Sequence, residues 1–233
     1  MRAILFDMDG VLIDAMPYHA EAFKRAFKEV IDLDIDTRDI YLLEGMPGAD
    51  LIKQILKKNM QYDNDEKVIK SISQRKKELF QQNEKSKPFE GVFELIQSLK
   101  LANCLKAVVS GASSHEVKTL LEKNGLIDNF DLIVTGDDLS EGKPSPQPFN
   151  KALEKFGLEA KDALVVENSP IGVDSAMKAG INYMVILNNT PLSLKDFTGL
   201  SQDEKVVSKK MFRDIKTASP TILNWCRNLN NNT

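Results

Sequence analysis

The sequence predicts an α/β protein with a doubly wound, Rossmann-like parallel sheet core and an inserted α-helical cap domain. Three observations support this prediction: short apolar runs without alternating charges, helical patterns between the later runs, and one long helical stretch after the first run. Strands that helices cover on both faces read as continuous apolar runs. Strands that alternate with helices are typical of doubly wound domains.

Five apolar runs, most of them rich in Val, Ile and Leu, are the predicted strands. They lie at residues 3–6, 107–109, 132–134, 163–166 and 183–187. Apolar residues three or four apart predict helices between the later strands, at residues 92–99, 117–121 and 149–156. Past residue 187 the pattern predicts a short edge strand at residues 206–207. It also predicts a final helix within residues 215–225, with Pro220 leaving the start of that helix open.

The stretch between the first two strands is mainly helical and shows no strand pattern. Its three apolar faces comprise Ala20, Phe23, Ala26 and Phe27; Leu51, Ile52, Ile55 and Leu56; and Val68, Ile69, Ile72, Leu79 and Phe80. This stretch is far longer than a connection from strand to helix requires. We therefore predict a core domain of residues 1–14 and 88–233 and a helical cap domain of residues 15–87, with a hinge near residues 86–91.

Composition and charge exclude several classes of protein. The 233 residues carry a formal net charge of −3 and lack the basic face that grips a phosphate backbone, so we expect no nucleic-acid partner. The basic run at residues 75–77 is read as a solvated helix face. No apolar run approaches the ~20 residues that cross a bilayer, and the first residues resemble a strand more than a signal peptide.

The two cysteines, Cys104 and Cys226, lie far apart in the sequence and form no metal-binding spacing. We expect them to be reduced thiols in a reducing compartment. The protein is therefore expected to be cytoplasmic, without a membrane partner. We also expect a monomer, because the sequence shows no heptad pattern.

Polar residues follow four of the predicted strands. They are Asp7 and Asp9, Ser110 and Gly111, Lys143, and Glu167 with Asn168. Because ligands of parallel α/β sheets bind at the carboxyl ends of the strands, we expect these residues to meet. Magnesium takes oxygen ligands from a few carboxylates and shares the substrate phosphate, while an ammonium and a hydroxyl can cover the remaining phosphate oxygens. The sequence therefore predicts a site for Mg²⁺ and a phosphate group.

The two aspartates at the end of the first strand can take different catalytic roles. Residues two apart point to the same face of a strand, but the chain turns near Gly10, so the side chains of Asp7 and Asp9 can converge from different depths. One carboxylate can attack phosphorus and form an aspartyl-phosphate. The other can protonate the leaving oxygen and then activate water.

Four motifs, in this order, resemble those of the haloacid dehalogenase superfamily. They are residues 7–11 (DMDGV), 108–111 (VVSG), 142–146 (GKPSP) and 165–169 (VVENS). With the last strand the resemblance spans residues 1–187, and the helical insert falls where subclass I members carry their cap. The subgroup most similar in sequence contains β-phosphoglucomutase and phosphoglycolate phosphatases.

The resemblance implies a role for each site residue. Asp7 is implied as nucleophile and metal ligand, and Asp9 as general acid and base with its carbonyl on the metal. Ser110 and the Gly111 N–H would hold the phosphoryl group, Lys143 would neutralise Asp7 and the phosphate, and Glu167 and Asn168 would complete the metal shell. Many relatives carry Asp where this chain has Asn168, which leaves open whether Glu167 or Asn168 touches the metal.

The insert is expected to choose the substrate. Tyr18 and His19 resemble the cap-hinge pair of the mutase, so His19 would couple cap closure to Asp9 or contact substrate; the alternative is a buried or helix-face histidine with a satisfied partner. The loop at residues 43–48, with Gly45, is expected to face the site. The mutase has Arg where this chain has Gly48 and Thr where it has Ala15, and both differences favour hydrolysis over phosphoryl transfer to a sugar.

The expected function is Mg²⁺-dependent hydrolysis of a small phosphate monoester, a sugar phosphate or a phosphoglycolate-like metabolite, through an aspartyl-phosphate. A phosphomutase is the alternative. A dehalogenase is disfavoured because its reaction needs neither Asp9 nor a metal. A non-catalytic phosphate-binding domain is disfavoured because the motif residues are present.

Overall fold

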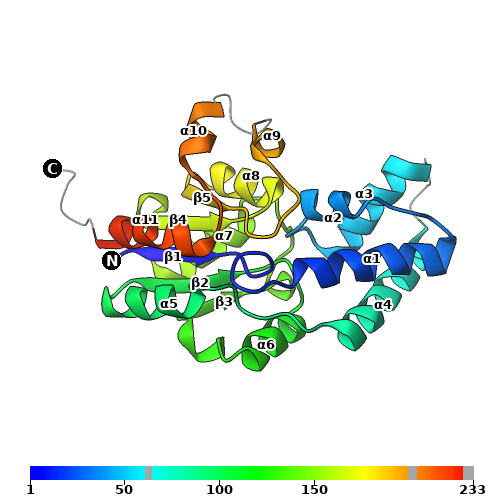
Figure 1. Cartoon of the computed structure of the whole chain (residues 1–233), viewed down its shortest axis with the longest axis horizontal. Helices are drawn as coiled ribbons and strands as arrows, with labels where there is room; N and C mark the ends of the chain where they lie inside the picture. The colour runs from blue at the N-terminus through cyan, green and yellow to red at the C-terminus, as the bar shows by residue number, and fades with distance from the viewer. Residues whose placement is uncertain (61–64, 199–203, 228–233) are drawn as a thin grey trace.

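The computed structural model describes residues 1–60, 65–198 and 204–227. Its centre is a six-stranded sheet in the order β3-β2-β1-β4-β5-β6, and every pair of neighbouring strands is parallel. The strands are β1 (Ala3–Phe6), β2 (Leu105–Val109), β3 (Leu132–Val134), β4 (Ala163–Glu167), β5 (Asn182–Ile186) and β6 (Met211–Phe212). The predicted α/β fold class is confirmed (Figure 1).

The first strand lies at the point where the strand order reverses. Phe6 pairs with Val108 of β2 on one side and with Val166 of β4 on the other. All four residues of β1 are fully buried, as a continuous apolar run predicts. In open α/β sheets this reversal creates a crevice at the carboxyl ends of the strands. The residues that follow β1, β2 and β4 therefore converge.

Helices cover the sheet and connect its strands. They are α5 (Val92–Leu101), α6 (Ser114–Lys123), α7 (Gln147–Phe156), α8 (Pro170–Lys178), α9 (Leu194–Phe197), α10 (Glu204–Lys209) and α11 (Ile215–Arg227), with short 3₁₀ helices at Ile127–Asn129, Gly136–Asp138 and Ala160–Asp162. The final helix begins at Ile215 and continues through Pro220. None of the described helices is both long enough and apolar enough to cross a membrane.

The predicted edge strand at residues 206–207 is wrong. Both residues lie in helix α10, and the edge strand is β6, where Met211 pairs with Val185 of β5. The side chain of Val207 is fully buried. Two adjacent valines favour a strand by intrinsic preference, but packing of a helix can override that preference.

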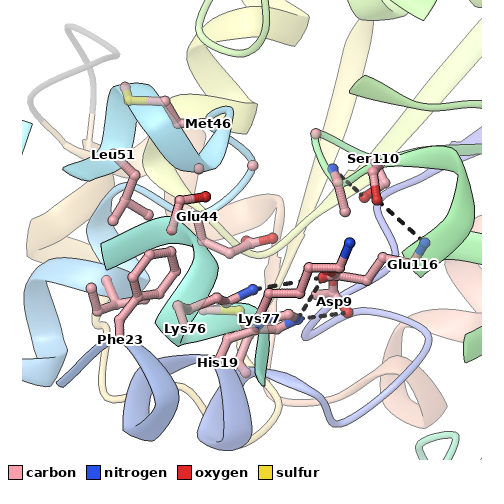
Figure 2. Close-up of a pocket in the computed structure, with 18 residues that line it drawn as sticks. Asp9, His19, Phe23, Glu44, Met46, Leu51, Lys76, Lys77, Ser110 and Glu116 are labelled. Carbon is pink, nitrogen blue, oxygen red and sulfur yellow. Dashed lines mark hydrogen bonds and ion pairs between the residues drawn. The ribbon is translucent and has the colours of Figure 1, made fainter. Parts of the chain in front are cut away.

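The insert, residues 15–87, contains α1 (Met16–Ile31), α2 (Thr37–Leu42), α3 (Gly48–Met60) and α4 (Glu66–Asn83). Helix α1 packs against α2 and α4, and α3 packs against α4. Figure 1 shows these helices together beyond one end of the sheet. The two segments that connect the insert to the sheet lie side by side, since the Asp14 N–H donates to the Lys87 carbonyl at 2.9 Å. A cavity of about 290 Å³ lies between the insert and the strand ends (Figure 2).

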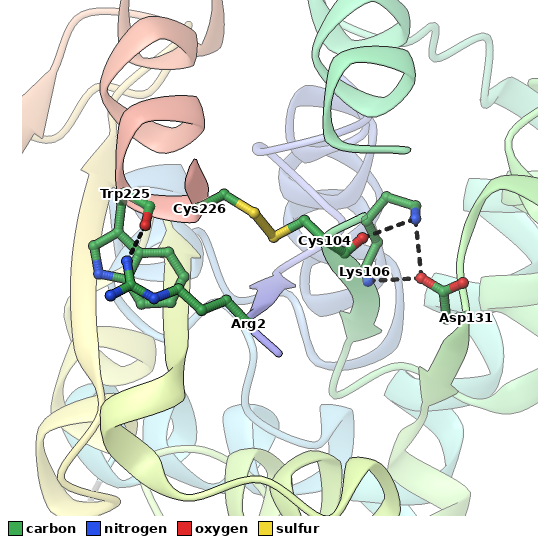
Figure 3. Close-up of a disulfide and its surroundings, with 6 residues drawn as sticks. All are labelled: Arg2, Cys104, Lys106, Asp131, Trp225 and Cys226. Atoms are coloured by element: carbon green, nitrogen blue, oxygen red, sulfur yellow. Dashed lines mark hydrogen bonds and ion pairs between the residues drawn. A yellow bond between two sulfur atoms is a disulfide. The ribbon is translucent and has the colours of Figure 1, made fainter. Parts of the chain in front are cut away.

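Cys104 and Cys226 form a disulfide, which overturns the expectation of two reduced thiols (Figure 3). Their Cα atoms are 6.3 Å apart, although 122 residues separate them in the sequence. The bond joins the approach to β2 to the last helix, α11, which packs against α5. Spacing could not show this proximity, because the fold alone brings α11 to the start of β2. The disulfide also removes the main support for a reducing compartment.

Candidate active site

Lys143 connects the ends of three strands. Its ammonium donates to Asp7 Oδ1 at 2.5 Å, to Glu167 Oε1 at 2.6 Å and to the Val109 carbonyl at 3.0 Å. Asp7 and Lys143 are each 1% exposed and Glu167 is not exposed at all. A buried ammonium is stable only where charge partners and hydrogen bonds satisfy it, and these three acceptors use all of its donors. The predicted catalytic lysine therefore lies in direct contact with the predicted nucleophile.

Glu167 is held at both carboxylate oxygens. Oε1 accepts from Lys143, while Oε2 accepts from the N–H groups of Asn168 at 2.9 Å and Ser169 at 3.1 Å and from the Ser169 hydroxyl at 3.1 Å. Ser169 also caps α8, and a side chain at Gly172 in its first turn would overlap the Glu167 carboxylate. These hydrogen bonds fix the orientation of the Glu167 carboxylate and occupy both of its oxygens.

Asn168 holds the turn that carries Asp9. Its Nδ2 donates to the backbone carbonyl of Asp9 at 3.1 Å. Gly10 follows with a φ of 86°, and a Cβ there would overlap the Asn168 amide, so both the backbone angle and the space require glycine. The remaining amide oxygen of Asn168 is buried without a hydrogen-bond partner.

Four buried side-chain oxygens lack a hydrogen-bond partner among the described residues: Asp7 Oδ2, Asp9 Oδ1, Asn168 Oδ1 and Glu44 Oε2. Buried polar atoms are normally satisfied, so a group of such oxygens indicates a ligand. Carboxylate and amide oxygens are the donors that Mg²⁺ prefers. Asp7, Asp9 and Asn168, which follow the neighbouring strands β1 and β4, therefore fit a magnesium ion.

Burial shifts the pKa of the acidic groups. It raises the pKa of Asp9 to about 7. Burial also raises the pKa of Asp7 to about 7: the Glu167 and Asp9 charges add to this increase, and Lys143 opposes it. Burial works against the charge of Lys143, but the Asp7, Glu167 and Glu44 carboxylates outweigh it and raise the pKa of that ammonium. A divalent cation beside the carboxylates would lower their pKa values.

Ser110 and Gly111 face the insert across a close contact. Ser110 is buried, and its hydroxyl accepts from the Ala112 N–H at 3.2 Å. A Cβ on Gly111 would overlap the carbonyl of Gly45, and one on Gly45 would lie 2.8 Å from Lys143 Cδ. The expectation that the loop at residues 43–48 faces the site is met in the structure, and two glycines permit its approach.

Sequence reasoning missed Glu44, the neighbour of Gly45. Glu44 is only 7% exposed and lines the cavity. One carboxylate oxygen each from Asp7, Glu44 and Glu167 lies within 4.8 Å of the others. Burial, then the negative charge of Asp7, raises the pKa of Glu44 well above its usual range. The sequence contains no signal for this placement, because the direction of a loop side chain depends on the tertiary fold.

His19 is buried beside Asp9. Its ring stacks on Phe80 with centroids 4.0 Å apart, and Nε2 lies 3.7 Å from both Asp9 Oδ1 and Glu116 Oε1 (Figure 2). Burial lowers the pKa of His19 to about 3, so the imidazole is neutral and neither contact is an ion pair. The 3.7 Å distances also exceed that of a hydrogen bond. His19 is therefore a buried histidine beside Asp9, but its Nε2 has no hydrogen-bond partner among the described residues, so the satisfied partner of the alternative reading is not found. Its coupling to cap closure or contact with substrate stays a prediction.

Two lysines of α4 line the cavity, which corrects the reading of residues 75–77 as a solvated face. Lys76 Nζ lies 3.7 Å from Glu116 Oε1 and about 5 Å above the rings of Phe23 and Phe80, which are 5.1 and 4.9 Å away. Lys77 is exposed at the rim, and Arg75 pairs with Glu29 outside the cavity. Charge runs do not reveal which of their members a helix turns inward. Gly48 also lines the cavity.

Comparison with known proteins identifies the family. Residues 4–186 match the haloacid dehalogenase-like hydrolase family. A phosphoglycolate phosphatase of Aquifex aeolicus is 32% identical over 80% of this chain and 85% of that protein. A phosphorylated carbohydrates phosphatase of Thermotoga maritima is 29% identical over 78% of this chain and 82% of that protein.

A solved structure of a proposed beta-phosphoglucomutase from Bacteroides vulgatus superposes with a TM-score of 0.85. Its sequence is 30% identical, and the match covers 98% of this chain and 90% of that one. The match to the family spans β1 to β5, which are the strands that deliver the site residues. The chain therefore belongs to the haloacid dehalogenase-like hydrolase family.

Proposed function

We propose that this chain is a Mg²⁺-dependent phosphatase that hydrolyses a small phosphate monoester through an aspartyl-phosphate on Asp7. One observation carries the proposal: Lys143 holds Asp7 by one oxygen, while the other oxygen is buried without a partner. A carboxylate held in this way has a free oxygen for attack and a neighbouring cation that offsets the charge of the phosphate.

In the first step, the free oxygen of Asp7 forms a bond to phosphorus as the bond from phosphorus to the leaving oxygen breaks. Asp9 donates a proton to that oxygen, so the leaving group departs as an alcohol. The pKa of about 7 that burial gives Asp9 suits a group that must hold a proton near neutral pH. Ser110 and the Gly111 N–H would bind the phosphoryl oxygens.

In the second step, Asp9 is a carboxylate and accepts a proton from water. The water oxygen bonds to phosphorus, the bond from phosphorus to Asp7 breaks, and inorganic phosphate leaves. His19 is neutral beside Asp9, so it adds no positive charge that would keep Asp9 from taking up the proton. The cycle returns both aspartates to their starting states.

Asp7, the Asp9 carbonyl and Asn168 would hold the magnesium ion. Bound Mg²⁺ supplies positive charge that brings two anions together. Glu167 would act differently, because both of its oxygens are engaged: it holds Lys143 and the turn after β4. This division favours Asn168 over Glu167 as the residue that touches the metal directly.

The insert would serve as the cap domain, with boundaries at residues 15 and 87. Support comes from the paired connecting segments at Asp14 and Lys87 and from the contact of Gly45 with Gly111 and Lys143. A cap that presses on the phosphate-binding loop shields the site from bulk solvent. Substrate would then be a small phosphorylated metabolite, such as those that the names of the relatives describe.

A phosphomutase is the second candidate, because of the similarity to the Bacteroides vulgatus protein. A mutase must hold the second phosphate of a bisphosphate, and position 48 offers only a glycine for this purpose. Position 15 is a fully buried alanine without a hydroxyl. Water is therefore the preferred acceptor. Monomeric and cytoplasmic states stay predictions, and the disulfide weighs against the second.

Turnover of p-nitrophenyl phosphate tests the proposal. We expect hydrolysis that requires Mg²⁺ and falls by at least about 10³-fold in Asp7→Asn, because the amide is not a nucleophile at that position. Asp128→Asn, an exposed aspartate on the Ile127–Asn129 turn, is the matched control. Activity that survives in Asp7→Asn, or in excess chelator, would refute the mechanism.

A further inference from the structure

The loop after β5 carries two asparagines, and the proposed mechanism uses neither. Asn188 Nδ2 donates to the backbone carbonyl of Gly10 at 2.7 Å. Asn189 Nδ2 donates to Asp14 Oδ2 at 3.0 Å. Both acceptors belong to the segment between β1 and the insert, which also carries Asp9. The loop therefore holds the residue that directly follows the proposed general acid.

Asn188 is also anchored at its other side-chain atom. Its Oδ1 accepts from the Ile215 N–H at 3.3 Å, in the first turn of α11. The first amides of a helix have no acceptor within the helix, so this N–H needs an outside partner. The two contacts also determine the orientation of the amide, because a carbonyl accepts only from Nδ2 and an N–H donates only to Oδ1. One side chain therefore connects the last helix to the Gly10 carbonyl.

Holding the Gly10 carbonyl restricts the turn that presents Asp9. Gly10 has a φ of 86° and no side chain whose packing could fix its conformation. Asn168 binds the preceding carbonyl at 3.1 Å, and Asn188 binds that of Gly10. Two consecutive carbonyls of one turn are thus held by side chains that follow two different strands. The direction of the Asp9 side chain is fixed together with them.

We propose that Asn188 is a positioning residue: through the Gly10 carbonyl it keeps the Asp9 carboxyl group directed at the leaving oxygen. This inference rests on the proposed phosphatase function and assigns part of its rate to a residue that does not line the cavity. Loss of the contact should slow proton donation and leave phosphate binding intact. A displacement of about 1 Å in a reacting group can cost about 10²-fold in rate.

The backbone at Asn188 suggests the variant that tests this role. Its φ of 45° is left-handed, a conformation that asparagine adopts more readily than most residues and glycine adopts freely. Glycine therefore removes the side chain without straining the backbone. Asn103 has a similar φ of 51°, is exposed, and lies just before β2, at the opposite end of that strand from Ser110. Asn103→Gly is therefore the matched control.

Two leaving groups that differ in their need for a proton provide the assay. p-Nitrophenolate leaves phosphorus unprotonated near neutral pH, whereas the benzyl alkoxide must receive a proton as it leaves. At saturating Mg²⁺ we expect Asn188→Gly to lower kcat/KM about tenfold or more for benzyl phosphate and about twofold or less for p-nitrophenyl phosphate. This constant reports the step in which the leaving group departs. Asn103→Gly should leave both values unchanged.

Asn188→Asp separates the two contacts of the side chain. The aspartate keeps an acceptor for the Ile215 N–H and loses the donor to the Gly10 carbonyl. It should therefore shift the ratio of the two kcat/KM values as Asn188→Gly does. A ratio that shifts only in Asn188→Gly would assign the effect to the docking of α11 and overturn the proposal.

Asp9→Asn separates the proposal from the proposed reaction. The amide has no carboxyl proton to donate, so this variant should shift the same ratio further. A shift in Asp9→Asn that is absent from Asn188→Gly would overturn the positioning role and leave the phosphatase standing.

Amide hydrogen exchange gives a readout that needs no turnover. The N–H groups of residues 10–13 donate to carbonyls within the turn. Asn188→Gly should speed their exchange about tenfold or more, and Asn103→Gly should not. Unchanged exchange would overturn the positioning role. Faster exchange in Asn188→Gly, when the wild-type protein cleaves neither ester, would support the hold of Asn188 on the turn and overturn the phosphatase.

Discussion

Asn168 performs two tasks with one side chain. Its Nδ2 holds the Asp9 carbonyl, and its Oδ1 is buried without a partner where the metal is expected. An aspartate at this position would add a negative charge but could not donate to the carbonyl. Replacing Asn168 by Asp would therefore add a charge for the metal and remove the hydrogen bond that holds the Asp9 turn.

We expect Asn168→Asp to lower the Mg²⁺ concentration for half-maximal activity by about 3- to 10-fold, because the charge of the ligands tunes cation affinity. Titration of p-nitrophenyl phosphate turnover with Mg²⁺ measures the effect. Asn150→Asp, at an exposed position of α7, adds the same charge elsewhere and is the control. An unchanged Mg²⁺ requirement would show that position 168 does not face the metal.

Asp7 and Asp9 link metal binding to stability. Each has a pKa of about 7 in the fold, above the ordinary value of 3.8. The unfolded chain releases these protons first, so the two groups cost no stability below about pH 4 and progressively more as the pH rises to about 7. Mg²⁺ stabilises the charged forms and should relieve this cost.

Thermal unfolding with and without Mg²⁺ tests this linkage. We expect Mg²⁺ to raise Tm by at least about 4 °C more at pH 8 than at pH 5, since 1 kcal/mol corresponds to about 2–4 °C for a chain of this size. Asp7→Asn should reduce the difference. Equal shifts at the two pH values would contradict the assignment of these carboxylates to the metal.

At the scale of elements, Glu116 of α6 meets two helices of the insert. His19 of α1 and Lys76 of α4 each approach its carboxylate at 3.7 Å. Only the Lys76 contact carries opposite charges, because His19 is neutral. A partly exposed pair of this kind contributes on the order of 0.2–1 kcal/mol. It therefore biases the insert toward the sheet without locking it there.

We expect Glu116→Gln to raise KM by about two- to fivefold with kcat nearly unchanged, because a weaker closing contact lowers the population that binds substrate. Steady-state kinetics on one neutral sugar phosphate measures both constants. Glu122→Gln, on the exposed side of the same helix, should behave as wild type. A fall in kcat at constant KM would instead indicate a role in the chemical step.

The site residues that the sequence predicted share one feature, their position at the ends of buried strands. Asp7 and Ser110 directly follow buried strands and Glu167 is the last residue of one, and a parallel sheet brings such strand ends together whatever the loops do. Glu44 and Lys76 escaped prediction because a loop or a helix face has several sides, and only packing selects the one that faces the cavity. The pairing of two distant cysteines depends in the same way on tertiary contacts.

At the scale of the whole molecule, the disulfide holds the last helix on the core. Crosslinks that close long loops stabilise by restricting the unfolded chain, typically by about 2–5 kcal/mol. We expect Cys104→Ser, or reduction with dithiothreitol, to lower the free energy of unfolding by that amount in denaturant titrations. Neither sulfur touches Lys143 or the aspartates, so turnover at 25 °C should persist. A Cys104→Ser protein of unchanged stability would show that the thiols do not pair in solution.

The disulfide also divides the chain into a ring and an arm. Residues 104–226 form a closed covalent circle that contains β2 to β6, Lys143 and Glu167. Asp7, the proposed nucleophile, and the whole insert belong to the arm, which contributes β1 to the sheet between β2 and β4. In the proposed mechanism the bond between phosphorus and Asp7 would therefore form on the arm, while Lys143, the cation that contacts Asp7, belongs to the ring. Cleavage of one peptide bond within the ring would leave its fragments joined until reduction, whereas cleavage within the insert would release the segment that carries Asp7 from covalent attachment.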